Sequence, residues 1–71
     1  MNMEIRWEDG YEIRIRTEND EIILSANREG LLSLAEQLKD LAEAPAGSHI
    51  HYDEYNSLEE GSCSLIIEKT E

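Results

Sequence analysis

The spacing of apolar residues predicts one amphipathic helix, from Asn27 to Ala44. Within this range the apolar residues recur three or four positions apart, so they fall on one side of a helix with about 3.6 residues per turn. This apolar stripe consists of Leu31, Leu34, Ala35, Leu38, Leu41 and Ala42. Asn27 can cap the first turn through its side-chain oxygen, and Pro45 with Gly47 should end the helix. We expect the stripe to pack against strands, because an isolated helix this short is marginal in water.

Five further segments alternate between apolar and polar residues, which predicts strands with one covered face. Their ranges are 3–7, 11–17, 22–26, 48–53 and 62–68. In chain order this gives three strands, a helix and two strands (β-β-β-α-β-β). We therefore expect an α+β fold with one mainly antiparallel sheet and the single helix packed on one of its faces. Residues 1–71 then form one small domain.

The first predicted turn, at residues 8–10, sets the register of the first hairpin. A two-residue turn would place Ile5 on the same face as Arg14, whereas a three-residue loop keeps one face apolar. We therefore expect the three-residue loop, with Gly10 at positive φ. The pairs that follow are Met3–Ile15, Ile5–Ile13, Trp7–Tyr11, Glu4–Arg14 and Arg6–Glu12.

The second predicted turn contains Asn19 and Asp20, which both tolerate left-handed backbone geometry. The pairs that follow are Ile13–Ala26, Ile15–Leu24 and Thr17–Ile22. These pairs extend the apolar face that should receive the helix. The opposite, outward face then carries Arg14, Arg16, Ile23 and Ser25.

The chain is strongly acidic. Its 71 residues include 17 acidic and 6 basic ones, which gives a formal net charge of -11 at pH 7. Such a chain should be repelled by nucleic acid and by anionic membranes and attracted to basic proteins. The same charge would also keep a small protein soluble and monomeric, so charge alone leaves both interpretations open.

Cys63 is the only cysteine, so an internal disulfide is not possible. Alternation places its side chain on the covered face of the last predicted strand, where we expect a buried and inert thiol. No apolar run is long enough to span a membrane and no signal peptide precedes the first strand, so cytoplasmic residence is the expectation.

The outward face of the predicted sheet is the first candidate binding surface. Arg14, Arg16 and Ile23 would supply guanidinium groups and an exposed aliphatic side chain, which suits docking or self-association. The alternative is a solvated face whose charges pair across the strands.

The pattern His49-x-His51-x-Asp53 is the second candidate. Alternation places the three side chains on one face of one strand, and two histidines with a carboxylate can bind zinc or non-haem iron. Neighbours on one strand seldom converge on a single ion, so the alternative is that the histidines bond to adjacent segments. We expect no cofactor.

The acidic loop at residues 53–61 is the third candidate, and we expect it to bind a protein partner. Its candidate residues are Asp53, Glu54, Tyr55, Leu58, Glu59 and Glu60. An aromatic and an aliphatic anchor ringed by charge are typical of binding hot spots, and the carboxylates would steer a basic partner. The alternative is that Tyr55 or Leu58 folds back onto the core.

Two stretches carry a family resemblance. The first is Ala26-Asn27-Arg28-Glu29-Gly30-Leu31-Leu32-x-Leu34-Ala35. The second is Gly47-Ser48-His49-Ile50-His51-Tyr52-Asp53, followed by Leu58, Gly61-Ser62 and Leu65-Ile66-Ile67-Glu68. They resemble the helix start and the C-terminal half of the immunity protein 32 family of bacterial polymorphic toxin systems. The resemblance implies a cytoplasmic antidote that binds and blocks a toxin domain, usually encoded beside it.

The leading hypothesis is a non-enzymatic immunity protein that binds a cognate, basic toxin domain and neutralises it by occluding its surface. No catalytic constellation is recognisable in the sequence. A second hypothesis is a small metal- or ligand-binding domain that uses His49, His51 and Asp53. A third is a structural homodimer that forms through the open sheet face or through an edge strand.

Overall fold

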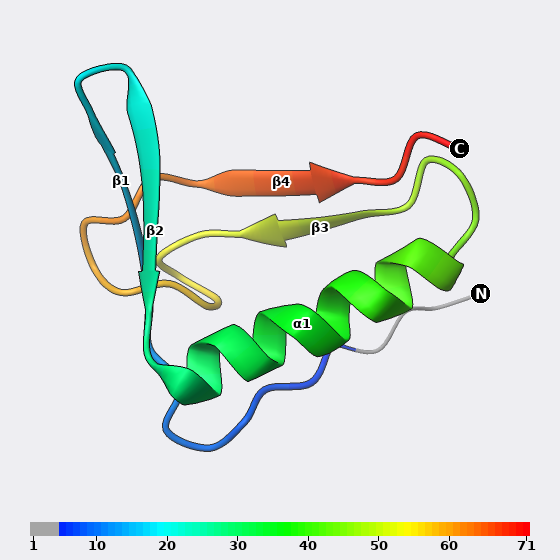
Figure 1. The fold of residues 1–71 in the computed structure, drawn as a ribbon, viewed down its shortest axis with the longest axis horizontal. Coiled ribbons are helices and arrows are strands. Elements are labelled where there is room, and N and C mark those ends of the chain that lie inside the picture. The colour runs from blue at the N-terminus through cyan, green and yellow to red at the C-terminus, as the bar shows by residue number, and fades with distance from the viewer. Residues whose placement is uncertain (1–4) are drawn as a thin grey trace.

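The computed structural model describes residues 5–71, which form two β-hairpins and one helix (Figure 1). In chain order the elements are β1 (Ile13–Glu18), β2 (Glu21–Ala26), α1 (Arg28–Glu43), β3 (His49–Tyr52) and β4 (Leu65–Glu68). β1 pairs with β2 and β3 pairs with β4, both antiparallel, and the two pairs form separate sheets. The predicted α+β class is confirmed, whereas the single sheet and the strand before β1 are wrong.

The β1–β2 hairpin has the predicted register. Its pairs include Ile13–Ala26, Ile15–Leu24 and Thr17–Ile22. Asn19 and Asp20 form the turn with φ angles of 51° and 66°. Positive φ at both central residues matches the right-handed twist of the flanking strands, which explains why this turn closes the hairpin tightly.

Residues 5–12 do not form the predicted first strand but run along α1 (Figure 1). The Glu8 N–H donates to Ser33 Oγ at 2.8 Å, and Gln37 Nε2 donates to the Arg6 carbonyl at 2.8 Å. Polar side chains of the helix thus satisfy main-chain groups that a strand ladder would otherwise have used. The expected strand pairing of this segment with β1 is therefore wrong.

The turn at residues 8–10 is nevertheless close to the prediction. Gly10 has a φ of 81°, and the Tyr11 N–H donates to the Glu8 carbonyl at 3.2 Å. The turn brings Trp7 onto Tyr11, with ring centroids 4.3 Å apart and planes inclined by 22°. The expected pairs of Met3 and Glu4 lie outside the described residues.

The connection between β3 and β4 covers the edge of β1 that the first strand was expected to cover. The Glu59 N–H donates to the Ile13 carbonyl at 2.9 Å, and the Cys63 N–H donates to the Ile15 carbonyl at 2.9 Å. β1 therefore lies between β2 and this connection, which joins the two hairpins into one body.

Helix α1 begins as predicted. Asn27 caps it, because its Oδ1 accepts a hydrogen bond from the Gly30 N–H at 2.8 Å. A Cβ atom at Gly30 would lie 2.6 Å from the Glu12 carbonyl oxygen and 2.9 Å from Ile13 Cγ1. The first turn thus packs so closely against the chain before β1 that only glycine fits without a shift of the backbone.

The core lies between the helix and the two hairpins. Its buried members are Ile13, Ile15, Leu34, Leu41, Ile50, Tyr52 and Leu58. β1, α1, β3 and the loop between β3 and β4 contribute these residues. Ala26 of β2 and Leu65 and Ile67 of β4 are partly buried at the margin of the core. The hydrophobic core is therefore small, and it draws on the loop between β3 and β4 through Leu58.

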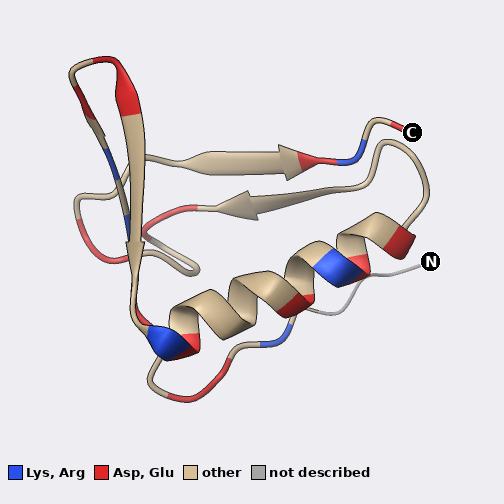
Figure 2. Ribbon diagram, in the orientation of Figure 1, with Lys and Arg blue, Asp and Glu red and all other residues tan. Residues whose placement is uncertain are grey.

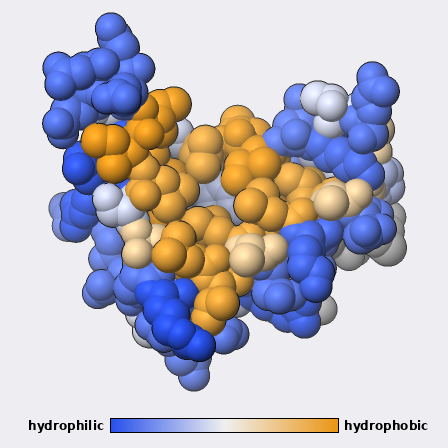
Figure 3. All heavy atoms as spheres, viewed as in Figure 1, coloured by the Kyte–Doolittle hydropathy of each residue, from blue (hydrophilic) through white to orange (hydrophobic). Residues whose placement is uncertain are grey.

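Helix α1 buries only part of its apolar stripe. Leu34 and Leu41 are buried, but Leu31 and Leu38 are 54% and 45% exposed. The buried face also includes Gly30, Ser33 and Gln37. This face is offset from the stripe by about one residue position, roughly 100° around the helix. The offset arises because Ser33 and Gln37 bind residues 5–12, and it leaves apolar side chains on the surface (Figure 3).

Acidic residues are spread over the described chain (Figure 2). They gather at the tip of the β1–β2 hairpin, where Glu18, Asp20 and Glu21 are exposed. They also lie at both ends of α1 and in the loops (Figure 2). The few basic residues lie among them, so the surface as a whole is negative.

Candidate functional site

Two of the predicted carboxylates hold the acidic loop in shape. Asp53 Oδ1 accepts hydrogen bonds from the Tyr55 N–H at 2.9 Å and from the Asn56 N–H at 3.0 Å. Glu54 Oε2 accepts one from the Gly61 N–H at 2.9 Å. The Asp53 bonds hold the turn at the start of the loop, and the Glu54 bond ties this turn to the end of the loop at Gly61.

Tyr55 projects from this loop into solvent and is 91% exposed. With Glu54 and Glu60 it lines an open pocket of about 360 Å³. The structure thus brings three of the predicted residues together as an aromatic ring bordered by two carboxylates.

Leu58 does not belong to this surface. Its side chain is buried in the core, and its N–H donates to the Asp53 carbonyl at 2.8 Å. The tight turn that starts at Asp53 directs Leu58 inward. Leu58 is thus a core residue in this structure, and an exposed anchor at this position is not available.

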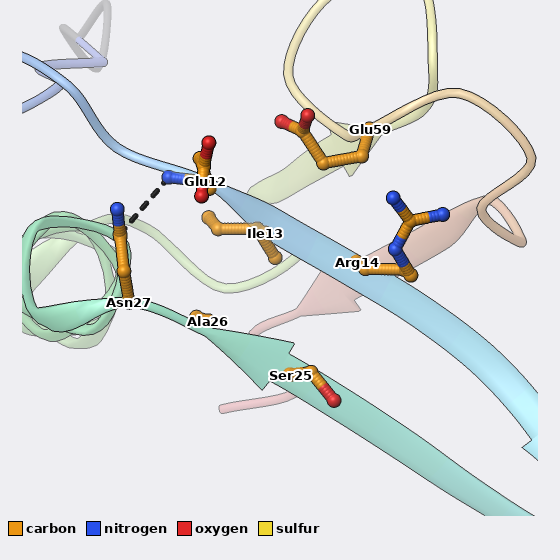
Figure 4. Close-up of a pocket in the computed structure, with 7 residues that line it drawn as sticks. All are labelled: Glu12, Ile13, Arg14, Ser25, Ala26, Asn27 and Glu59. Atoms are coloured by element: carbon orange, nitrogen blue, oxygen red, sulfur yellow. Dashed lines mark hydrogen bonds between the residues drawn. The ribbon is translucent and has the colours of Figure 1, made fainter.

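The outward face of the β1–β2 hairpin meets the acidic loop at Arg14. An open pocket of about 410 Å³ lies here, lined by Glu12, Ile13, Arg14, Ser25, Ala26, Asn27 and Glu59 (Figure 4). Arg14 and Glu59 lie on the same side of β1 (Figure 4), and Arg14 Nη1 donates to the Glu60 carbonyl at 3.2 Å. The structure therefore joins Arg14 in one surface with Glu59 and Glu60, although 46 positions separate Arg14 from Glu60.

Arg16 and Ile23 extend this outward face. They lie directly opposite each other in the β1–β2 pairing. Arg16 Nη1 donates to Ser25 Oγ at 3.2 Å, and its Nε lies 3.7 Å from the Glu18 carboxylate. The outward face thus combines intramolecular polar contacts with an aliphatic side chain.

His49 and His51 lie on β3, which pairs with β4 in a separate sheet. They therefore do not share a sheet face with Arg14 and Arg16. Their ring centroids are 4.8 Å apart, and His49 Nδ1 lies 3.2 Å from the Gly47 carbonyl oxygen. The Asp53 carboxylate is engaged in its own turn and does not join them. Within residues 5–71, no three His, Cys, Asp or Glu side chains gather in a way that could hold a metal ion.

Cys63 is exposed, so the expectation of a buried thiol was wrong. The residue precedes β4, which begins only at Leu65. Since its N–H bonds to β1, the strand alternation used for the prediction does not extend to this position.

Sequence reasoning did not foresee one further surface, an uncovered apolar face. We define it by Ile22 and Leu24 of β2, Leu31, Ala35 and Leu38 of α1, and Leu65 and Ile67 of β4. Figure 3 shows apolar side chains gathered over these elements, with a hollow beside the β1–β2 hairpin. Ile22 is 72% exposed and Leu31 is 54% exposed. The sequence marked these positions as apolar, but the exposure of Leu31 and Leu38 depends on how α1 is rotated.

Comparison with known families gives a match over most of the chain. The model of a family described as Immunity protein 32 matches residues 21–70, which include β2, α1, the acidic loop and both strands of the second hairpin. Neither a curated protein nor a solved structure matches the chain. Among the described residues, no helix has the length and apolar character needed to cross a membrane.

Proposed function

This chain belongs to the immunity protein 32 family, and on that basis we propose that it binds a cognate bacterial toxin domain and neutralises it. The family membership is the observation that carries the proposal. Neutralisation would be non-enzymatic: the chain covers a surface that the toxin needs. It acts in the cytoplasm, where the toxin would otherwise reach its target.

The charge of the chain favours a basic toxin. A formal net charge of -11 attracts a positively charged protein and accelerates its association, while it repels nucleic acid and anionic membranes. A toxin that acts on nucleic acid carries a basic surface for the phosphate backbone. An acidic antidote can occupy that surface.

Within this proposal the acidic loop supplies the central contact. Tyr55 is an exposed aromatic side chain on a loop whose shape Asp53 and Glu54 already hold, so binding costs little ordering of the loop. Glu59 and Glu60 add negative charge beside it. The loop meets Arg14, and the outward face continues from there to Arg16 and Ile23.

The test is co-expression with the toxin domain encoded by the neighbouring gene. The wild-type chain should protect the host cell and co-purify with the toxin. Tyr55→Ala combined with Glu59→Lys should weaken binding by about 100-fold. The matched control, Ile66→Ala combined with Glu68→Lys on β4, changes an exposed apolar and an exposed acidic residue elsewhere and should leave binding unchanged.

Two results would contradict the proposal at different levels. Absence of protection and of co-purification for the wild-type chain would overturn the toxin-binding function. Binding by the Tyr55 and Glu59 variant at wild-type strength would retain the function and move the contact away from the acidic loop.

A further inference from the structure

The uncovered side of α1 is apolar over two turns. Leu31, Ala35 and Leu38 are spaced by four and three residues, so they lie in one row along the helix. All three are exposed, although the helix buries polar Ser33 and Gln37 on its neighbouring face. A helix that buries polar residues and exposes leucines has a rotation that its own hydrophobicity does not favour.

β2 and β4 extend this row into a broad surface. Leu24 follows Ile22 on the same side of β2, and Leu65 and Ile67 stand half-buried on the covered side of β4. Figure 3 shows the apolar side chains gathered across these elements, on a surface that is hollowed between the β1–β2 hairpin and the rest of the chain. Contiguous apolar surface of this kind on a small protein marks a site of protein interaction.

The hairpin beside the hollow ends in an unusually acidic tip. Glu18 faces Glu21 directly in the strand pairing, and Asp20 lies in the turn between them. Like charges placed opposite each other weaken a hairpin. The hairpin therefore carries negative charge at a cost to its own stability, which is expected where a positively charged partner approaches.

We propose that the apolar face binds the toxin through an apolar protrusion surrounded by basic residues. This inference rests on the toxin-binding function proposed above and assigns it a second surface, on the opposite side of the β1–β2 hairpin from Arg14, Arg16 and Ile23. The apolar side chains supply the desolvated centre of the contact, and the acidic tip meets basic residues at its rim.

Charge and shape favour this occupant over a second copy of the chain. Each copy has a formal net charge of -11, so two copies repel each other. A hollow surface also fits a protruding partner better than it fits an identical hollow, which would leave unfilled space between the copies.

The test compares a double variant within the apolar face with a single control variant outside it. In both variants glutamine replaces exposed apolar residues. Leu31→Gln with Leu38→Gln removes the centre of the apolar face without changing charge, and glutamine is a good helix former. Ile66→Gln, at a β4 side chain that is 57% exposed and points away from the apolar face, is the control. The toxin domain encoded by the neighbouring gene is the probe in co-purification and titration.

The double variant should lose about 100-fold or more in affinity, whereas the control variant should bind as the wild type does. Thermal unfolding of both variants checks that they fold. If the wild type binds and the folded double variant binds equally well, the apolar face is not the contact and the toxin-binding function stands. If the wild type does not bind at all, both the function and this surface are overturned.

Two measurements without toxin test the same surface. Sedimentation of the wild type should show a monomer, and the neutral dye Nile red should bind it more than it binds the double variant. A wild-type dimer that the double variant dissociates would assign the face to a second copy and overturn the proposal. Equal dye binding by both folded chains would show that the leucines are covered in solution, which also overturns it.

The acidic tip gives an independent readout. Glu21→Gln should slow association with the toxin at low ionic strength, and the difference should vanish at high salt. The same change should raise the melting temperature of the free chain, since it removes the like-charge pair with Glu18. A change in stability with no change in association rate would remove the tip from the contact.

Discussion

The side chains of Tyr52 and Gln37 connect β3, α1 and the segment of residues 5–12. The Tyr52 hydroxyl donates to Gln37 Oε1 at 2.7 Å, and Gln37 Nε2 donates to the Arg6 carbonyl at 2.8 Å. Both side chains are almost fully buried. Within residues 5–71, no buried side-chain nitrogen or oxygen lacks a hydrogen-bond partner. This chain of bonds fixes the side of α1 that faces residues 5–12.

Tyr52→Phe should lower the free energy of unfolding by about 1–3 kcal/mol, because Gln37 Oε1 would remain buried without a donor. Urea denaturation followed by circular dichroism measures the change. Tyr55→Phe, at an exposed tyrosine, is the control and should have no effect. Equal stability of Tyr52→Phe and the wild type would mean that this bond does not hold the helix in place.

Tyr52→Phe should also change how the free energy of unfolding depends on pH in the alkaline range. Burial raises the pKa of the Tyr52 hydroxyl above its ordinary value of 10.0. The folded chain therefore keeps the phenol proton where the unfolded chain loses it, so stability from this group is complete below pH 10.0 and falls as the pH rises further. Between about pH 9 and about pH 11, Tyr52→Phe should lose less stability than the wild type. A greater loss in the variant would contradict this assignment.

At the scale of elements, α1 is attached to the preceding chain at its first turn. Asn27 Oδ1 accepts hydrogen bonds from the Gly30 N–H at 2.8 Å and the Glu12 N–H at 3.0 Å, and its Nδ2 donates to the Gly10 carbonyl at 2.9 Å. One side chain thus caps the helix and holds the chain before β1. The close contact at Gly30 follows from this arrangement.

Asn27→Ala removes all three bonds and should lower stability by roughly 2 kcal/mol. Asn27→Asp keeps both acceptor bonds and places a negative charge at the helix N-terminus, which the helix dipole favours, so its loss should be smaller. Thermal and urea unfolding of the two variants give the order. Equal losses for alanine and aspartate would show that the donor bond to Gly10 dominates.

At the scale of the whole molecule, we expect charge repulsion to oppose folding more than ion pairs support it. Within residues 5–71, three ion pairs join Arg6 to Asp40 at 3.5 Å, Arg16 to Glu18 at 3.7 Å, and Arg28 to Glu29 at 3.4 Å. All of them have exposed members, and such pairs contribute at most about 1 kcal/mol each. We therefore expect them not to offset the repulsion within a chain of formal net charge -11.

Moderate salt should therefore raise the melting temperature. Ions screen the repulsion between distant carboxylates, and at about 0.1 M the screening length is roughly 10 Å. Calorimetry between low and moderate sodium chloride concentrations measures the effect, with Glu36→Gln as a variant that should already melt higher at low salt. A melting temperature that falls with added salt would mean that the ion pairs matter more than the net charge.

The features of the fold that depend on neighbouring residues could be predicted from the sequence. The alternation in β1 and β2, with Asn19 and Asp20 between them, predicted the hairpin register correctly. The cap at Asn27 was equally readable, since a cap depends on residues within one helical turn. The family resemblance also lay in contiguous stretches, and the family model matches over the same region.

The candidate site was predictable only in part. Tyr55 and its flanking acids were recognised from composition, and the structure places Tyr55 at the surface and Leu58 in the core. The sequence could not distinguish the two, because the direction of each side chain depends on the turn at Asp53 and on the docking of the loop against β1. The meeting of Arg14 with Glu60 had no signal in the sequence, since 46 positions separate them.

The sequence did not determine which distant segments pack against each other. Residues 5–12 bind α1 and leave one edge of β1 to the loop between β3 and β4. That choice rotates α1 and exposes Leu31 and Leu38. Periodicity states which residues share a side of a strand or a helix, and it is a property of near neighbours. Which segment covers that side is settled by competition among all segments within reach for the same hydrogen bonds and the same apolar area, and this competition exists only in the folded chain.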